Sequence, residues 1–155
     1  MAPKIVPDAP MQLARIATSD GTATTILDNI TSSFANVSHD GTMIGGFVWP
    51  SDGSAAALFT VVPTAGGAPL YQLTLPAGVG PLRWAPGDKA IQYATNRGGA
   101  SNVWETPLAG GTPRQVTSFD SLVIGDFAWS HDGKTLALAR GTSGSDVIVM
   151  TNFEK

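Results

Sequence analysis

The sequence repeats itself with a period of about 45 residues, and this period limits the possible folds more than any other feature. The segment Ala128–Lys134 reads Ala-Trp-Ser-His-Asp-Gly-Lys, and Arg83–Lys89 reads Arg-Trp-Ala-Pro-Gly-Asp-Lys. An earlier copy is Asn36–Thr42, in which Val37 takes the place of the tryptophan. Because one landmark returns at nearly equal intervals, we infer that the chain is built from like structural units.

A second motif recurs along the chain with the same spacing as the first. The segments Pro63–Pro69 and Pro107–Pro113 both carry Ala-Gly-Gly between two prolines, and Thr18–Ala23 occupies the corresponding place one period earlier. Two independent landmarks that keep the same spacing are hard to obtain by chance. The repeat is therefore a property of the whole chain and not of one short motif.

Each repeat unit predicts four short strands. We expect strands at 34–37, 43–49, 56–62 and 70–75 in the first complete unit, and at 81–84, 89–94, 102–106 and 114–117 in the second. The glycines between these segments tolerate the positive φ that tight hairpins need, and no segment shows sustained helical periodicity. Four strands in about 45 residues are typical of a β-propeller blade, so the sequence predicts an all-β fold of four-stranded antiparallel blades.

The repeats resemble those of a known family. The segment Trp129–Lys134 resembles the Ser-Pro-Asp-Gly turn of TolB-like, WD-repeat-like propeller blades, and residues 95–104 and 110–117 resemble the second half of such a blade. Two departures are visible, since His39 and His131 stand where the family has proline and the middle unit reads Ala-Pro-Gly-Asp. The resemblance runs from about Met11 to Phe153. It implies a propeller fold but no particular activity, because one fold serves many functions.

The strands predict a single partial β-propeller over residues 1–155. Its parts are a partial blade at 11–29, blades at 33–76 and 81–118, and an incomplete blade at 125–153, or about three and a quarter blades. Known propellers close with about four to eight blades, so the exposed sides of these sheets must be covered by further blades. We expect oligomerisation to complete the ring.

The favoured assembly is a homodimer with a ring of about six blades. In this arrangement the strand at 23–27 of one chain completes the partner's blade at 146–150. The alternative is that the sequence is a section of a longer propeller chain that supplies the remaining blades itself.

Composition excludes several classes of function. The formal net charge is −3 and the pI is near 5.1, without clustered Lys or Arg, which argues against nucleic acid and against a polybasic membrane patch. No apolar stretch approaches the ~20 residues of a membrane span. Cysteine is absent, which excludes disulfides and thiolate metal sites. No signal-peptide pattern follows Met1, and the compartment stays open.

The repeat turns are expected to have structural roles. The residues concerned are Asp40, Gly41, Asp88, Asp132 and Gly133. We expect their aspartates, and likewise Asp52, to accept hydrogen bonds from nearby backbone N–H groups, as in Asx-type turns. The equivalent tryptophans Trp84 and Trp129 are expected to pack between neighbouring sheets. Trp104, on a third strand, is also expected to pack in the core.

The two histidines, His39 and His131, suggest catalysis or metal binding, but their context does not support either. Ser130, His131 and Asp132 are adjacent in sequence, whereas the members of a catalytic triad come from separate segments. Two histidines in separate units need a third ligand to hold zinc, and the sequence identifies none. The glycine pairs 66–67 and 110–111 lack the following Lys-Ser/Thr and helix of a phosphate loop. We predict no catalytic residue, no metal and no cofactor.

A binding surface is predicted where the loops between second and third strands share a face with the links between blades. The residues on that face are Trp49, Asn96, Arg97, Phe119 and Asp120, with Ser143 and Ser145 in a third such loop. An exposed aromatic side chain beside an arginine is typical of recognition hot spots. The alternative for each residue is an ordinary loop role.

These features predict a non-catalytic interaction or scaffold module, part of or derived from a larger bacterial propeller protein, that binds a protein or peptide. One alternative is a propeller associated with a hydrolase, a peptidase or a kinase-type sensor. The ending Asp146–Met150 resembles that of propellers attached to bacterial kinase or regulator modules. The other alternative is a self-assembling structural piece with no ligand of its own.

Overall fold

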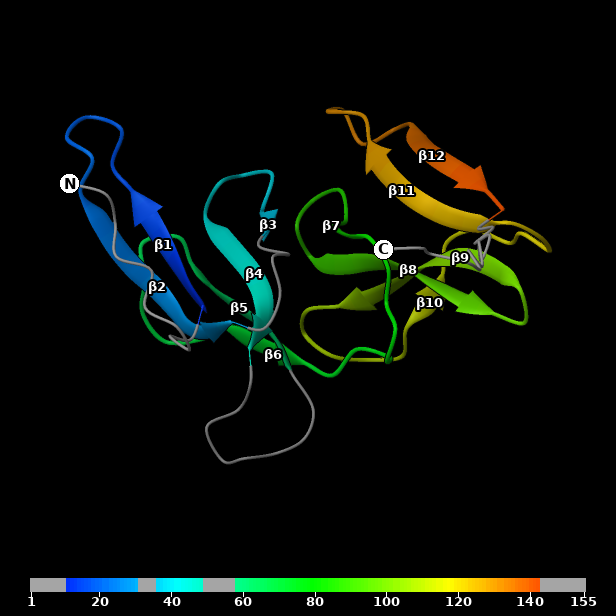
Figure 1. Cartoon of the computed structure of the whole chain (residues 1–155), viewed down its shortest axis with the longest axis horizontal. Helices are drawn as coiled ribbons and strands as arrows, with labels where there is room; N and C mark the ends of the chain where they lie inside the picture. The colour runs from blue at the N-terminus through cyan, green and yellow to red at the C-terminus, as the bar shows by residue number, and fades with distance from the viewer. Residues whose placement is uncertain (1–10, 31–35, 49–57, 143–155) are drawn as a thin grey trace, which may run out of the picture.

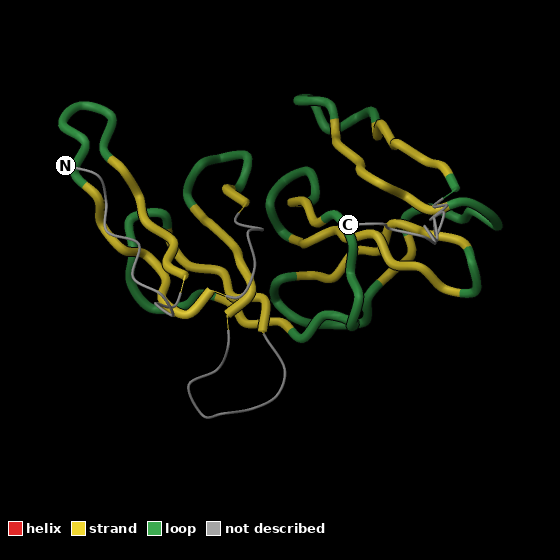
Figure 2. Tube along the Cα trace, viewed as in Figure 1, coloured by secondary structure: helices red, strands yellow, loops and turns green. Residues whose placement is uncertain are grey.

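The computed structural model describes residues 11–30, 36–48 and 58–142. Throughout these ranges the chain forms antiparallel strands joined by turns, and no helix occurs in them (Figure 2). In the described ranges there is consequently no helical segment that could cross a membrane. The sequence-based expectation of an all-β protein is confirmed.

The middle sheet shows the repeat unit in full. It contains β7 (Leu82–Trp84), β8 (Ala90–Arg97), β9 (Ala100–Pro107) and β10 (Arg114–Gln115), hydrogen-bonded in the order β10-β9-β8-β7. Every neighbouring pair is antiparallel, so each strand folds back on the one before it. The strands β8 and β9 run longer than expected because Gly98 and Gly99, with φ of 65° and 89°, close a two-residue turn between them.

The first sheet follows the same plan and carries an additional hairpin. Its strands β3 (Asn36–Val37), β4 (Met43–Val48), β5 (Leu58–Pro63) and β6 (Tyr71–Leu73) pair in sequential antiparallel order. The hairpin of β1 (Met11–Ile16) and β2 (Ala23–Ile30) joins β4 through the single pair Ile30↔Val48. The sequence placed this hairpin in a blade of its own, whereas its end is hydrogen-bonded to the first sheet.

The third sheet consists of β11 (Val123–Trp129) and β12 (Leu136–Gly141) in the described ranges. The strand expected at 146–150 lies outside the described residues. β11 begins before the expected Phe127 and passes an irregularity between Ile124 and Asp126. Figure 1 shows the first sheet at one end of the long axis of the molecule and the middle sheet at the other, with the hairpin of β11 and β12 above the middle sheet.

The core lies between the sheets. Residues Ile91 and Tyr93 of β8 belong to a cluster with Phe59 and Val61 of the first sheet, while Ala94 belongs to a second cluster with Phe127 of β11. Side chains alternate across a strand, so β8 presents one face to each neighbouring sheet. The middle sheet is therefore buried on both faces, and the three sheets are stacked face to face.

Candidate functional site

The first strand of each repeat contributes to one groove with a volume of about 160 Å³. β3, β7 and β11 and the turn after β3 supply its lining, which consists of Asn36, Val37, His39, Arg83, Trp84, Ala128 and Trp129. We call this feature the inner-strand groove. It brings together residues that are about 45 and 90 positions apart in the sequence.

The lining residues occupy equivalent positions in the repeat. Asn36, Arg83 and Ala128 each stand immediately before the tryptophan position of their unit. Val37, Trp84 and Trp129 occupy the tryptophan position itself. The groove is consequently a product of the repeat, because the same two positions of three units face one space.

An ion pair connects two of the inner strands beside this groove. Arg83 Nη2 on β7 lies 2.7 Å from Asp126 Oδ1 on β11, and Arg83 Nη1 donates a hydrogen bond to the carbonyl of Leu82 at 2.8 Å. The side chains of Arg83 and Asp126 are 35% and 59% exposed. An ion pair this exposed adds at most about 1 kcal/mol of stability, so the guanidinium is accessible to a partner that approaches the groove.

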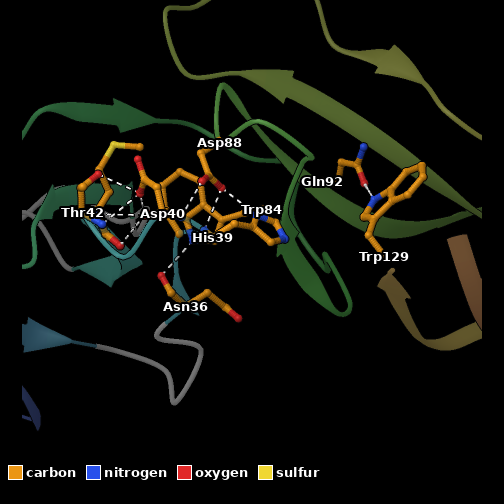
Figure 3. Close-up of polar contacts among 10 residues, drawn as sticks. Asn36, His39, Asp40, Thr42, Trp84, Asp88, Gln92 and Trp129 are labelled. Carbon is orange, nitrogen blue, oxygen red and sulfur yellow. Dashed lines mark hydrogen bonds and ion pairs between the residues drawn. The ribbon is translucent and has the colours of Figure 1, made fainter. Parts of the chain in front are cut away.

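The two equivalent tryptophans join neighbouring sheets, as the sequence predicts. Trp84 Nε1 donates to the carbonyl of Asn36 on β3 at 2.9 Å, and Trp129 Nε1 donates to Gln92 Oε1 on β8 at 2.6 Å (Figure 3). Both contacts reach from one repeat to the preceding one. Trp104 packs half-buried against the larger core cluster, also as expected.

Asp40 and Asp132 accept hydrogen bonds within their own turns. Asp40 Oδ1 accepts from Ser38 Oγ at 2.7 Å and from the backbone N–H of Thr42 at 2.9 Å. Asp132 Oδ1 accepts from Ser130 Oγ and from the backbone N–H of Lys134. In both turns the serine hydroxyl is the main cause that holds the pKa of the aspartate below its ordinary value, followed by the backbone N–H. Asp52 lies outside the described residues.

Asp88 has a different role from the other two turn aspartates. It occupies the place of Gly41 and Gly133 in its turn and, like them, has a positive φ, here 55°. Its Oδ1 accepts from the backbone N–H of His39 at 3.0 Å and lies 2.7 Å from His39 Nδ1, and its Oδ2 accepts from the backbone N–H of Asp40 at 3.0 Å (Figure 3). The carboxylate thus fastens the middle sheet to the turn of the preceding one.

The loop face predicted from sequence is formed in part by described residues. The turn after β8 lies beside the link that follows β10, because Asn102 Nδ2 donates to the carbonyl of Phe119 and Asn102 Oδ1 accepts from its N–H. Phe119 is half-buried, and the Arg140 guanidinium lies 3.5 Å from the centroid of its ring. The ring therefore already has a cationic partner within the chain.

The other described residues of that face form hydrogen bonds with residues close to them in the sequence. Asn96 Oδ1 accepts from the N–H of Gly99, and Asp120 Oδ1 accepts from Ser121 Oγ. Only the backbone of Arg97 is described, and Trp49, Ser143 and Ser145 lie outside the described residues. A binding role for this face stays a prediction.

The described side chains form no arrangement that resembles a hydrolytic site. Ser38 Oγ and Ser130 Oγ donate to the aspartates two positions later and not to a histidine. His39 contacts Asp88, and no group of three or more metal-ligating side chains occurs among the described residues. His39 and His131 do line a common small cavity of about 130 Å³ between the equivalent turns of the three sheets, together with Asp132.

The inner-strand groove escaped the sequence analysis although a signal for it was present. Trp84 and Trp129 were assigned to packing, and Asn36, Arg83 and Ala128 were not singled out. The signal is that these three residues occupy the same position of the repeat, immediately before the tryptophan. That the first strands of the three units lie around one groove depends on how the sheets stack, which the sequence does not indicate.

The comparisons with known proteins found matches among solved structures. No protein-family model matches the sequence, and no curated protein matches it. Among solved structures, the chain is similar to one assigned as TolB from Agrobacterium tumefaciens, with a TM-score of 0.47 and 18% identity. The match covers 86% of this chain, which spans 55% of the length of that structure.

Proposed function

We propose that this chain is a section of a β-propeller that binds protein or peptide partners in its inner-strand groove and carries out no chemistry on them. The observation that supports this most strongly is the repetition of the lining, in which equivalent positions of three stacked sheets face one space. A concave surface between structural units is where proteins most often bind their ligands. Polar groups of Asn36, His39 and Arg83 beside apolar Val37 and the indoles offer both specificity and contact area.

The backbone beside the groove favours an extended peptide as the ligand. Among the described strands, β7 pairs only with β8, and β11 pairs only with β12. The other edge of each strand carries N–H and C=O groups that can pair with an added strand. An extended segment laid along one of these edges would place alternate side chains against the groove.

Peptide selection against the protein tests this proposal. Peptides are selected by display on the wild-type chain, and their affinities are then measured for Val37→Asp and Leu122→Asp. Both positions are exposed hydrophobics, 54% and 38% accessible, but Val37 lines the groove and Leu122 belongs to the link beside the β8–β9 turn. We expect Val37→Asp to abolish binding and Leu122→Asp to leave it unchanged. The reverse result would assign the site to the loop face and contradict the groove.

We further propose that a second copy of the chain covers the open side of the third sheet. In β8, Gln92 and Ala94 are buried between sheets, with exposures of 1% and 2%. Their repeat equivalents in β12, Ala137 and Ala139, are exposed, while Leu136 and Leu138 pack on the core cluster. The outward face of β12 therefore corresponds to a face that is buried in the middle sheet, but no other sheet among the described residues covers it.

We assign the β1–β2 hairpin of the second copy to the edge of the third sheet, beside the face that this copy covers. It is attached to its own sheet by one backbone pair, and it exposes Met11 and Ile16 at 52% and 63%. In a homodimer, this hairpin of one chain would extend the third sheet of the other. Two chains of this kind would form a closed ring with two-fold symmetry.

A further inference from the structure

A cavity with a volume of about 350 Å³ lies between the middle and third sheets. The charged and polar side chains around it are Lys89, Gln92, Glu105 and Arg114, and Trp129 closes it from the third sheet. We call it the inter-sheet cavity. Its volume is in the range of small-molecule sites, and it shares only Trp129 with the lining of the inner-strand groove.

A chain of hydrogen bonds fixes one wall of this cavity. Trp129 Nε1 donates to Gln92 Oε1 at 2.6 Å, and Gln92 Nε2 donates to Glu105 Oε2 at 2.8 Å. Arg114 Nε donates to Glu105 Oε1 at 2.8 Å. Because Gln92 is 1% exposed and both of its polar atoms are engaged, the wall is held in place before any ligand arrives. Figure 3 shows the contact between Gln92 and Trp129.

The charges around the cavity do not cancel. Glu105 is 14% exposed and both of its oxygens accept hydrogen bonds from the wall, so its charge is already compensated. Lys89 forms no salt bridge with any described residue. Two cations and one carboxylate leave an excess of one positive charge, with donors in excess of acceptors. The rest of the lining is apolar, chiefly the Trp129 indole and Val116.

We propose that the inter-sheet cavity binds a carboxylate that is attached to a small apolar or aromatic body. The ammonium of Lys89 and the remaining guanidinium donors of Arg114 would hold the carboxylate through charge-assisted hydrogen bonds. The apolar body would pack against the Trp129 indole and Val116. A free monocarboxylate and the C-terminal carboxylate of a peptide share this chemistry.

The indole N–H resonance of Trp129 provides a direct test by nuclear magnetic resonance. Phenylacetate is titrated into the full chain, and its uncharged analogue phenylacetamide serves as the matched control ligand. We expect phenylacetate to shift the Trp129 signal in a saturable way, with little effect on the Trp84 signal, which reports on the groove. A Trp129 signal that is unmoved by phenylacetate, or equal affinity for the amide, would overturn the proposal.

Substitution of Lys89 tests where the carboxylate of bound phenylacetate lies. Lys89→Gln should weaken phenylacetate binding about tenfold, the loss expected for one charge-assisted hydrogen bond. Lys134→Gln is the matched control, because Lys134 is the repeat equivalent of Lys89 in the third unit and lies outside this cavity. Equal affinity of the two variants would contradict the assignment. If Lys89→Gln fails to fold, the comparison of acid and amide on the wild-type chain still decides the proposal.

A second titration distinguishes the two sources of the carboxylate. The tripeptide Gly-Gly-Phe and its C-terminal amide are compared with phenylacetate on the same Trp129 signal. Tighter binding of the tripeptide acid assigns the cavity to peptide termini, and binding of phenylacetate alone assigns it to free monocarboxylates. Either result supports a carboxylate site, and binding of neither acid overturns it.

Discussion

Asp88 shows how one residue change within a repeat creates a contact between repeats. The other two repeat turns place Asp before Gly, and each aspartate bonds within its own turn. In the middle turn the order is Gly87-Asp88, so the aspartate takes the positive φ and its carboxylate reaches His39 and Asp40 of the preceding sheet. Aspartate tolerates this backbone conformation better than most residues, which makes the exchange possible.

Replacing Asp88 by glycine isolates the contribution of its carboxylate. Glycine accepts the positive φ without strain, so the variant loses the three contacts to His39 and Asp40 and little else. We expect the free energy of unfolding to fall by about 1–3 kcal/mol, because the contacts to a charged acceptor that is itself buried are lost. Urea denaturation measures this as a lower midpoint with an unchanged slope. Asp126→Asn removes the charge of the exposed pair with Arg83 and keeps an oxygen that can accept from the N–H of Phe127, so it should cost less than about 1 kcal/mol. Equal losses in the two variants would contradict this assignment.

The turn aspartates should make the stability of the folded chain depend on pH in the acid range. The pKa of Asp132 is depressed in the folded chain, chiefly by the hydroxyl of Ser130. A depressed pKa contributes stability that is present above the unfolded value, near pH 4, and is lost as the pH falls through the lower folded value. Ser130→Ala should raise the pKa of Asp132 towards its ordinary value.

Carboxyl titration by nuclear magnetic resonance measures this shift. Asp20 is the internal control, because its pKa is lowered mainly by the backbone N–H of Thr22 in a different turn and should not respond to Ser130→Ala. An unchanged titration of Asp132 in the variant would show that the hydroxyl is not the cause.

At the scale of elements, the sequence predicted the positions of the strands better than the contacts between sheets. The period and the turn residues located the strands of both complete units, because glycine pairs and Asp-Gly turns act locally. The early start of β11 and the single pair between Ile30 and Val48 depend on contacts between distant segments. The same limit explains why Asn36 and Arg83 were missed, since only stacked sheets bring their strands to one groove.

Gly45 marks a close approach within the first sheet. A Cβ at this position would overlap the ring of Phe59, which is fully buried on the neighbouring strand β5. Gly45→Ala should therefore lower the free energy of unfolding by about 1–3 kcal/mol through overpacking. Gly125→Ala on β11 is the control, because its Cβ would meet its nearest neighbour at 3.9 Å, an ordinary contact distance.

A double-mutant cycle tests the cause of this effect. Phe59→Leu shortens the side chain that blocks the site, so Gly45→Ala should cost less in that background than in the wild type. Urea denaturation of the four proteins gives the coupling energy. Strict additivity of the two changes would mean that the ring of Phe59 is not what excludes a side chain at position 45.

At the scale of the whole molecule, the described sheets differ in how many of their faces are packed. The middle sheet is complete in this respect because one core cluster lies on each side of it. The third sheet packs Leu136 and Leu138 inwards but leaves Ala137 and Ala139 exposed. A second copy of the chain that covers this face would give every repeat the same surroundings.

Removal of residues 1–29 tests the role of the β1–β2 hairpin in that assembly. The shortened chain keeps both complete repeat units and loses β1 and most of β2. We expect it to lose the defined dimer, because the partner's third sheet then has no added strands. Analytical ultracentrifugation compares the two proteins, and an unchanged stoichiometry after the deletion would rule out exchange of this hairpin.

Light scattering of the intact chain after size exclusion tests the central claim most directly, namely that stacked like sheets are closed by a second copy. One chain has a mass of 16.0 kDa, so the dimer should scatter as a particle of about 32 kDa over a wide range of concentrations. A compact, well-behaved particle of 16.0 kDa would contradict it, because the outward face of β12 would then be stable without a partner.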